Sequence, residues 1–109
     1  GMNEIIIDEL RILCQNRAIR WTTHVLERLQ ERDIQPRDVK AAIMSGEVIE
    51  QYPTDYPYPS CLVLGAAVSG RWLHVVCGIG DNRIFIITAY YPDPKRWQSD
   101  FKTRKGSTQ

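Results

Sequence analysis

The stretch TTHVLERLQERDIQPRDVKAAIMSG, residues 22–46, predicts two consecutive amphipathic helices joined by a short turn. The hydroxyl of Thr22, or of the threonine after it, can cap the first helix. Asp33 can leave that helix in a left-handed conformation, which Asx residues tolerate better than most. Pro36 suits the first position of the second helix, and Gly46 ends it. The stretch therefore predicts a helical hairpin.

After this hairpin the spacing of apolar residues changes from a helical to an extended period. Four runs rich in β-branched and aromatic residues follow, separated by turns that contain Pro, Gly or Asn: EVIEQY (47–52), SCLVLGAAV (60–68), RWLHVVCGI (71–79) and RIFIITAYY (83–91). Strands joined by tight turns are usually neighbours in a sheet. These runs therefore predict an antiparallel sheet of three to four strands.

The segments at the two ends of the chain complete the predicted fold. Residues 3–16 have apolar side chains at helical spacing, with Asn3 as a candidate N-cap. Residues 17–21, RAIRW, read as a connector or a short extended piece, and residues 92–101, PDPKRWQSDF, predict a short closing helix entered through Pro94. The expected fold class is α+β, with the helices packed on one face of the antiparallel sheet.

The composition limits the classes of protein to which the chain can belong. Its 109 residues fit a single domain, residues 1–109, and the apolar (43%) and charged (25%) fractions are those of a globular protein. A formal net charge of +1 gives no strong overall field toward nucleic acid or an anionic membrane. The three widely spaced cysteines match no metal or disulfide pattern, so we expect buried free thiols in a cytoplasmic protein without membrane spans.

A histidine and two arginines lie four residues apart in the first helix of the hairpin. At about 100° per residue, His24, Arg28 and Arg32 span roughly 80° of the helix surface, along the border of its apolar stripe. A border position lets an arginine lay its stem on apolar surface and present its guanidinium beside the sheet. The same row can instead be a solvated edge, in which Glu27 and Glu31 form ion pairs with the arginines at helical spacing.

The predicted sheet supplies a second group of polar residues. Alternation places Trp72, His74 and Val76 on one face of their run, and Ile84, Ile86, Thr88 and Tyr90 on one face of the next run. Both faces of both runs are largely apolar, so alternation leaves open which face is the core. His74 is then either a half-buried histidine held by hydrogen bonds or a catalytic group that faces a threonine and a tyrosine.

Two histidines, a tyrosine and several arginines are the side chains that metal-independent ribonuclease chemistry requires. One group takes the proton of the 2′-hydroxyl, another protonates the leaving 5′-oxygen, and arginine stabilises the charged phosphorane. The candidate catalytic residues are His24, Arg28, His74 and Tyr90, and the candidate substrate-binding residues are Arg32, Thr88 and Arg71. No metal-ligand spacing, phosphate-cradling loop or nucleophile elbow is present, so we expect no metal and no cofactor.

These polar residues belong to a longer pattern: Thr22-x-His24-x3-Arg28-x3-Arg32-x-Ile34, then Val39 and Gly46-Glu47-Val48-Ile49, then Leu73-His74-Val75-Val76 and finally Ile87-Thr88-x-Tyr90. The combination resembles the domain of unknown function 4258 family over about residues 21–101. The helix at 3–16 is then an accessory element, and residues 102–109 form a polar, flexible tail. Members of the family resemble the RelE-like toxins at the level of the fold, which implies a small RelE-like α+β ribonuclease architecture. The chain departs from the family pattern at Asp33, where glycine is common, and at Gln35, where a hydroxyl cap is common.

Two classes of function follow from these patterns. The first is a toxin-type endoribonuclease, with RNA or the ribosome as its target and an antitoxin-like protein as its partner. The alternative is a non-catalytic protein-interaction module, in which the His/Arg/Tyr set forms a buried polar network that pins the helix to the sheet. A homodimer is compatible with either function, and no membrane partner is expected. The closing stretch also combines basic and aromatic residues, which indicates RNA or an acidic partner, or a solvated tail docked by its aromatic rings. These residues are Lys95, Arg96, Lys102, Arg104 and Lys105, with Trp97 and Phe101 among them.

Overall fold

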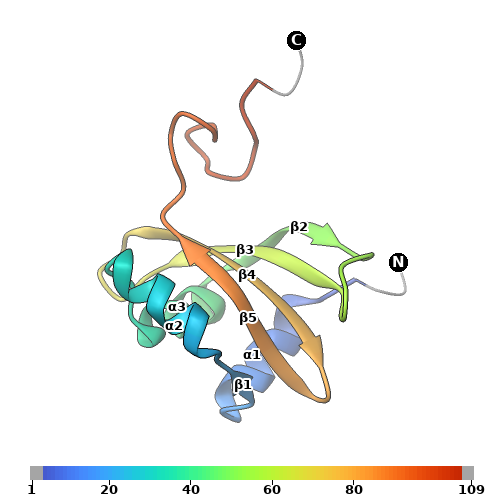
Figure 1. The fold of residues 1–109 in the computed structure, drawn as a ribbon. Helices are drawn as coiled ribbons and strands as arrows, with labels where there is room; N and C mark the ends of the chain where they lie inside the picture. Colours follow the sequence, from blue (N-terminus) through green and yellow to red (C-terminus); the bar gives the residue numbers. More distant parts are fainter. Residues whose placement is uncertain (1–3, 107–109) are drawn as a thin grey trace.

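The computed structural model describes residues 4–106, which form three helices and a five-stranded mixed sheet (Figure 1). In chain order the elements are α1 (Ile7–Gln15), β1 (Ile19–Arg20), α2 (Thr23–Glu31), α3 (Pro36–Ser45), β2 (Glu47–Tyr52), β3 (Ser60–Ala66), β4 (Trp72–Gly80) and β5 (Arg83–Tyr90). The strand order across the sheet is β1-β5-β4-β3-β2. This arrangement confirms the α+β fold class.

The strand count and the strand directions differ from the prediction. β1 pairs in parallel with β5, whereas the other neighbouring strands are antiparallel. Ile19 lies opposite Ile84, and the carbonyl of Ala18 accepts a hydrogen bond from the Ile84 N–H at 2.8 Å. The expectation of a purely antiparallel sheet of three to four strands was therefore wrong. A strand of two residues is too short to show a period in the sequence.

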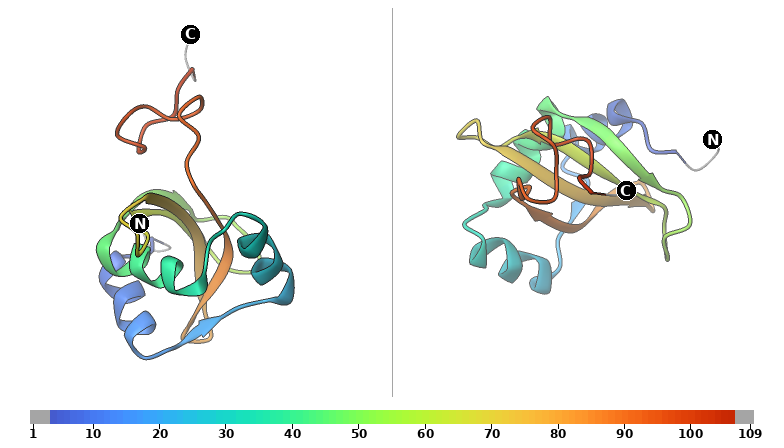
Figure 2. Two further views of the ribbon diagram at one scale, coloured as in Figure 1. Left: turned by 90° about the vertical axis from the view of Figure 1, so that its left-hand side faces the viewer. Right: turned by 90° about the horizontal axis from the view of Figure 1, so that it is seen from above.

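All three helices pack against one face of the sheet, as predicted. The C-terminal segment, defined here as residues 92–106, stands on the other face (Figure 2). The core lies between the helices and the sheet, and its side chains come from α1 (Leu10, Cys14), α2 (Val25, Leu29), α3 (Val39, Ala42, Ile43) and the strands (Cys61, Val63, Leu73, Val75, Cys77, Ile84, Ile86, Ala89). The three cysteines are buried free thiols, which confirms that expectation.

The ends of the hairpin helices follow the signals in the sequence. The Thr22 hydroxyl accepts a hydrogen bond from the N–H of Val25 at 3.1 Å and caps α2. Asp33 leaves α2 with a φ of 59°, and Pro36 is the first residue of α3. Helix α1 begins only at Ile7, and the proposed cap at residue 3 lies outside the described residues. Within residues 4–106, no helix is long and apolar enough to cross a bilayer.

A β-bulge in β5 changes which side chains share a face. Val76 pairs with Thr88, whereas the next residue of β4 pairs with Ile86, so Ile87 is an extra residue between the two pairs. Up to Ile86 the core face follows strict alternation, and after the bulge it continues at Ala89. Thr88 and Tyr90 therefore lie on the opposite face from Ile86, and the predicted common face of the four residues was wrong.

The C-terminal segment has no helix, so the predicted closing helix at 92–101 was wrong. Asp93 forms a single turn in which its carboxylate accepts from the Lys95 N–H at 2.9 Å and its carbonyl accepts from the Trp97 N–H at 3.1 Å. Such a side-chain acceptor gives the backbone an alternative to helical hydrogen bonds. A bridge between Trp97 and Arg104 then folds the segment back on itself.

Replacement of Gly65 by alanine is expected to destabilise the fold. A Cβ on this residue of β3 would overlap the backbone carbonyl of Ala42 in α3. Overpacking of a core costs typically about 1–3 kcal/mol, and two backbones in contact leave little room for adjustment. The measurement is urea unfolding. The neighbouring variant Ala66→Ser, as the control, is expected to change the free energy of unfolding by less than about 0.5 kcal/mol. Wild-type stability of Gly65→Ala would contradict this close approach of α3 to β3.

Candidate functional site

His74 is fully buried, with an exposed fraction of 0%, on the face of the sheet away from the helices. Its imidazole lies beneath the C-terminal segment, where the Trp97 ring meets it edge to face at a centroid distance of 4.5 Å. Tyr90, its partner across the β4–β5 pair, makes a second edge-to-face contact at 5.3 Å. Three separate segments of the chain therefore enclose this histidine.

Both ring nitrogens of His74 have hydrogen-bond partners. Nε2 lies 2.8 Å from the backbone carbonyl of Phe101, which can only accept, so a neutral ring carries its proton on Nε2. Nδ1 is then an acceptor for the Tyr90 hydroxyl, 3.4 Å away. Burial lowers the pKa of His74, and the bond to Phe101 opposes that effect only in part. The result is a neutral imidazole in one tautomer with an oriented tyrosine beside it.

An ion pair holds the end of the C-terminal segment against β2. Arg104 donates from Nε and Nη2 to the two carboxylate oxygens of Glu50, each at 3.0 Å, and its guanidinium lies 4.6 Å from the centre of the Trp97 ring. These hydrogen bonds lower the pKa of Glu50. The Tyr52 hydroxyl also donates to Glu50, and burial followed by this contact raises the pKa of Tyr52 to about 12. Carboxylate, tyrosine and guanidinium thus form one charged network beside His74.

A hollow of about 370 Å³ opens between the end of β5 and the C-terminal segment. Its lining consists of aromatic rings, two arginines and one carboxylate: Tyr90, Tyr91, Trp97, Arg96, Arg104 and Asp93. We call it the Tyr90 hollow. Burial raises the pKa of Tyr90, so its hydroxyl stays protonated at neutral pH. The hollow therefore combines stacking surfaces, positive charge and a proton donor.

The structure separates the predicted catalytic residues into two groups. His74 and Tyr90 are in contact on the face of the sheet away from the helices, which we call the outer face. His24 and Arg28 are exposed on α2, which packs on the other face. Among residues 4–106, no hydrogen bond, ion pair or ring contact joins His24 or Arg28 to His74 or Tyr90. The four candidates therefore do not form one catalytic centre in this structure.

The predicted substrate-binding residues have other partners. Arg32 donates from Nη1 to the hydroxyl of Thr88 and to the carbonyl of Ala89, both at 2.9 Å. It thereby gives two acceptors of β5 a hydrogen-bond donor at the edge where no described strand pairs with them. Arg71 places its guanidinium 3.6 Å from the centre of the Tyr91 ring. Both arginines have structural contacts that account for their positions.

Several residues of the site were absent from the predicted set. Glu50, Tyr52, Arg96, Trp97 and Arg104 come from β2 and from the C-terminal segment. The basic and aromatic composition of residues 95–104 was the available signal for the last three. Nothing in EVIEQY alone indicates that its glutamate and tyrosine approach a histidine in β4, because β3 lies between the two strands.

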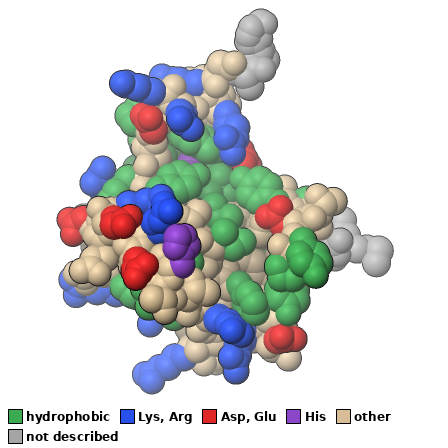
Figure 3. All heavy atoms as spheres, in the orientation of Figure 1, with side chains coloured by type: hydrophobic (Ala, Val, Ile, Leu, Met, Phe, Trp, Pro, Cys, Tyr) green, Lys and Arg blue, Asp and Glu red, His purple; other side chains and the backbone are tan. Residues whose placement is uncertain are grey.

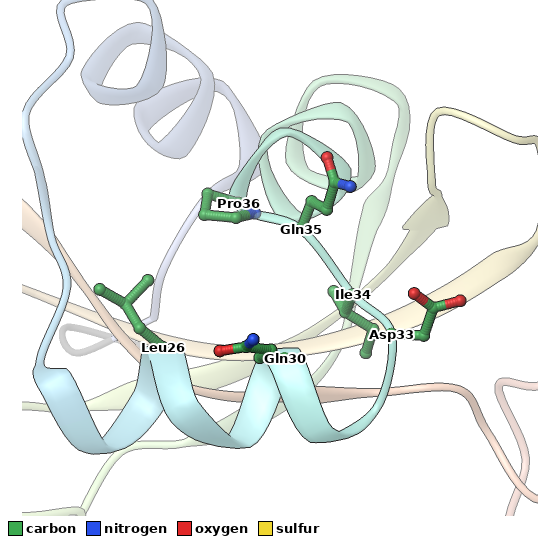
Figure 4. Close-up of a pocket in the computed structure, with 6 residues that line it drawn as sticks. All are labelled: Leu26, Gln30, Asp33, Ile34, Gln35 and Pro36. Carbon is green, nitrogen blue, oxygen red and sulfur yellow. The ribbon is translucent and has the colours of Figure 1, made fainter.

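A second hollow, of about 300 Å³, lies at the joint of α2 and α3 (Figure 4). Leu26 and Gln30 line it from α2, and Pro36 lines it from the start of α3. Its single titratable side chain is Asp33. This lining offers neither a base with a partner nor a cationic clamp. Within residues 4–106 there is also no group of three or more His, Cys, Asp or Glu side chains able to hold a metal ion.

The fold and the site define a small helix-on-sheet protein with an aromatic and charged network on the outer face of its sheet. A family model described as a domain of unknown function (DUF4258) matches residues 21–91, more than half of the chain. The chain belongs to this family. The match includes His74 and Tyr90 and ends before the C-terminal segment. Comparisons with curated proteins and with solved structures found no match.

Stability is expected to fall as the pH is lowered from 7 to 5.5, because of His74. In the unfolded chain the imidazole of His74 binds a proton near pH 6.5, whereas in the folded state its lowered pKa keeps it neutral to lower pH. The stabilising contribution is therefore complete above the unfolded pKa and is lost on acidification. Urea unfolding at several pH values measures this dependence. The variant His74→Gln should reduce the slope, and His24→Gln should retain it; equal slopes in all three proteins would refute the assignment.

Arg32 and Arg28, one helical turn apart, are expected to respond differently to truncation. Arg32→Ala removes two hydrogen bonds to β5 and should lower the free energy of unfolding by about 1–2 kcal/mol. Arg28→Ala removes an exposed side chain and should change it by less than about 0.5 kcal/mol. Thermal and urea unfolding of the two variants measure this difference. Equal losses of stability would contradict the structural role of Arg32.

Proposed function

We propose that this protein is a metal-independent endoribonuclease of the RelE-like toxin type, and that single-stranded RNA binds in the Tyr90 hollow. One observation carries the proposal. Tyr90, whose hydroxyl is hydrogen-bonded to a buried neutral histidine, lines a hollow together with two arginines and two further aromatic residues. The resemblance of the family to RelE-like toxins supports the same class of activity.

The lining of the hollow suits a single-stranded nucleotide. Bases stack on aromatic side chains, and each stacked base contributes about 1–3 kcal/mol to binding. Tyr91 provides such a ring, with Arg71 already stacked on it. Trp97 is only 4% exposed and lies beneath Arg104, so it supports the wall of the hollow and does not itself stack a base. Arg96 makes no ion pair within residues 4–106, so its guanidinium is free to contact phosphate. Arg104 also lines the hollow, but its guanidinium is already paired with Glu50.

The Tyr90–His74 pair can act as a proton relay. Tyr90 takes the proton of the RNA 2′-hydroxyl and passes its own proton to Nδ1 of His74, whose Nε2–H remains bonded to Phe101. The 2′-oxygen then bonds to phosphorus, and the bond between phosphorus and the 5′-oxygen breaks. The relay returns the proton to that 5′-oxygen. The products are a 2′,3′-cyclic phosphate and a 5′-hydroxyl, and both side chains end in their starting states.

The distribution of charge sets the expected mode of binding. The chain has a net charge of only +1, so a long RNA groove is not expected, and affinity would come mainly from the local arginines and stacked bases. A target held in place by another molecule, such as RNA on the ribosome, fits this modest charge. The toxin type also implies an antitoxin-like protein that blocks the activity.

One observation favours a non-catalytic interaction module as the second candidate. His74 is fully buried and has partners at both ring nitrogens, as expected of a network that only pins the C-terminal segment to the sheet. Under either function, Tyr90→Phe should lower stability by about 1–3 kcal/mol, because it leaves Nδ1 of His74 without its donor. If the protein is such a module, the wild-type protein does not cleave RNA.

The deciding experiment is cleavage of single-stranded RNA, free and on translating ribosomes, in the presence of a chelator. Tyr90→Phe is expected to reduce kcat at least about 100-fold, since general acid–base groups contribute about 10²–10⁴-fold. Arg96→Ala should raise KM more than it lowers kcat. His24→Ala, at an exposed position on α2, is the control and should retain wild-type activity.

Three results would refute the proposal. One is the absence of cleavage by the wild-type protein on both substrates. Another is equal activity of wild type and Tyr90→Phe when both are folded. The third is a loss of activity in His24→Ala that matches the loss in Tyr90→Phe, which would move the site to α2. Unfolding curves of each variant, measured alongside, separate a lost fold from lost chemistry.

A further inference from the structure

The outer edge of β5 is only partly covered. β1 pairs with β5 at Ile84 and Phe85 and then ends at Arg20. Beyond Phe85, no strand among residues 4–106 lies on this side of β5. Arg32 meets the edge again at Ala89, where it donates to the carbonyl. From Ile86 to Thr88 the backbone of β5 therefore has no strand partner among the described residues on this side, although Arg32 also bonds the Thr88 hydroxyl. Such an edge can accept a further strand.

An apolar groove runs along this exposed edge. It has a volume of about 490 Å³ and more apolar than polar lining: Val25 from α2, Pro57 and Tyr58 from the loop before β3, and Phe85, Ile86 and Ile87 from β5, with Arg20, Thr22 and Asp81 at its rim. The bulge residue Ile87 is 47% exposed although it is a large aliphatic residue. The face seen in Figure 3 shows hydrophobic side chains gathered over β5, with Lys and Arg side chains above and below them.

The flank of the groove is positively charged. Arg32 is bonded to β5, so the side of α2 that carries His24, Arg28 and Arg32 faces this edge. Arg20 lies at the rim, with its guanidinium 5.7 Å from the centre of the Phe85 ring. Neither Arg20 nor Arg28 has an ion-pair partner within residues 4–106. The carboxylate at the rim, Asp81, accepts a hydrogen bond from Tyr58 at 3.3 Å.

We propose that this groove binds a short, extended, acidic segment of another protein, which adds to the edge of β5. The backbone of the segment would continue the line of β1 along Ile86 to Thr88. Its alternate apolar side chains would enter the groove beside Ile87, and its carboxylates would meet Arg20 and Arg28. In strand addition, backbone hydrogen bonds supply affinity and side-chain pockets supply specificity.

The charges argue against a second copy of this chain as the occupant. A two-fold pairing of two β5 strands would place both α2 helices on the same face of the joined sheet. The arginine rows of the two copies would then lie opposite each other, and like charges across an interface are costly. An acidic partner has the opposite effect. This inference does not depend on RNA cleavage, because it uses neither His74 nor the Tyr90 hollow.

The test is selection of peptides from a random dodecapeptide library displayed on phage, with the wild-type protein as bait. The variant Ile87→Lys, once circular dichroism shows that it is folded, serves as the counter-selection bait and removes peptides that bind outside the groove. We expect enriched peptides with net negative charge and apolar residues at alternate positions. A synthetic copy of the enriched peptide should shift the NMR amide signals of Ile86 to Thr88. Arg28→Glu should weaken its binding about tenfold or more, and Arg37→Glu, an equal charge change on α3, less than about twofold.

Several outcomes would overturn the proposal. These are enriched peptides that bind Ile87→Lys as well as wild type, that are neutral or basic, or that shift amides elsewhere in the protein. Each result contradicts the groove as the binding site or its preference for acidic peptides. A library without enriched sequences does the same. Self-association that Ile87→Lys abolishes in sedimentation experiments would assign the edge to a second copy instead.

Discussion

The organisation of the outer face of the sheet depends on the burial of one imidazole. A histidine with no exposed surface needs a partner at each polar ring nitrogen. For His74 these partners are the carbonyl of Phe101 and the hydroxyl of Tyr90. The bond to Phe101 requires the C-terminal segment to stay on the sheet. This segment contains no helix or named strand that would hold it there. Trp97 above the ring and the ion pair between Arg104 and Glu50 add to that attachment. The same contacts form the walls of the Tyr90 hollow.

Local signals in the sequence predict much of the fold. A hydroxyl cap at Thr22, a left-handed Asp33 and a proline at the start of α3 each act within a few residues, and each is found where expected. Predictions failed where a distant contact decides the conformation. Residues 19–20 are extended, in keeping with the short extended piece expected at 17–21, but their parallel pairing with β5 was not predicted, because it depends on a strand far away in the sequence. Residues 92–101 form turns over the sheet, because aspartate side chains there bond to the backbone and because Trp97 packs on His74.

The candidate site shows the same division between local and distant contacts. His74 and Tyr90 were selected from strand residues, and they are neighbours across the β4–β5 pair. The expected sharing of a face by Ile86 and Tyr90 failed, because strict alternation cannot anticipate the bulge at Ile87. Residues 102–109 were expected to be a polar tail, and within that range Lys102 pairs with Glu47 and Arg104 with Glu50. Of the row His24, Arg28 and Arg32, only Arg32 bonds to the sheet, at the edge of β5, while His24 and Arg28 are exposed and have no hydrogen bond, ion pair or ring contact with the histidine of β4.

The most direct test of the proposed site is an NMR titration of the wild-type protein with a short single-stranded oligoribonucleotide whose 2′-hydroxyls are methylated. Methylation prevents cleavage, so binding is observed without chemistry. If RNA binds in the Tyr90 hollow, the amide signals of Tyr90, Tyr91, Arg96 and Trp97 should shift together and saturate, and the shifts should weaken with added salt. Shifts confined to α2, around His24 and Arg28, or no shifts at millimolar oligonucleotide, would contradict the assignment of the hollow as the RNA site.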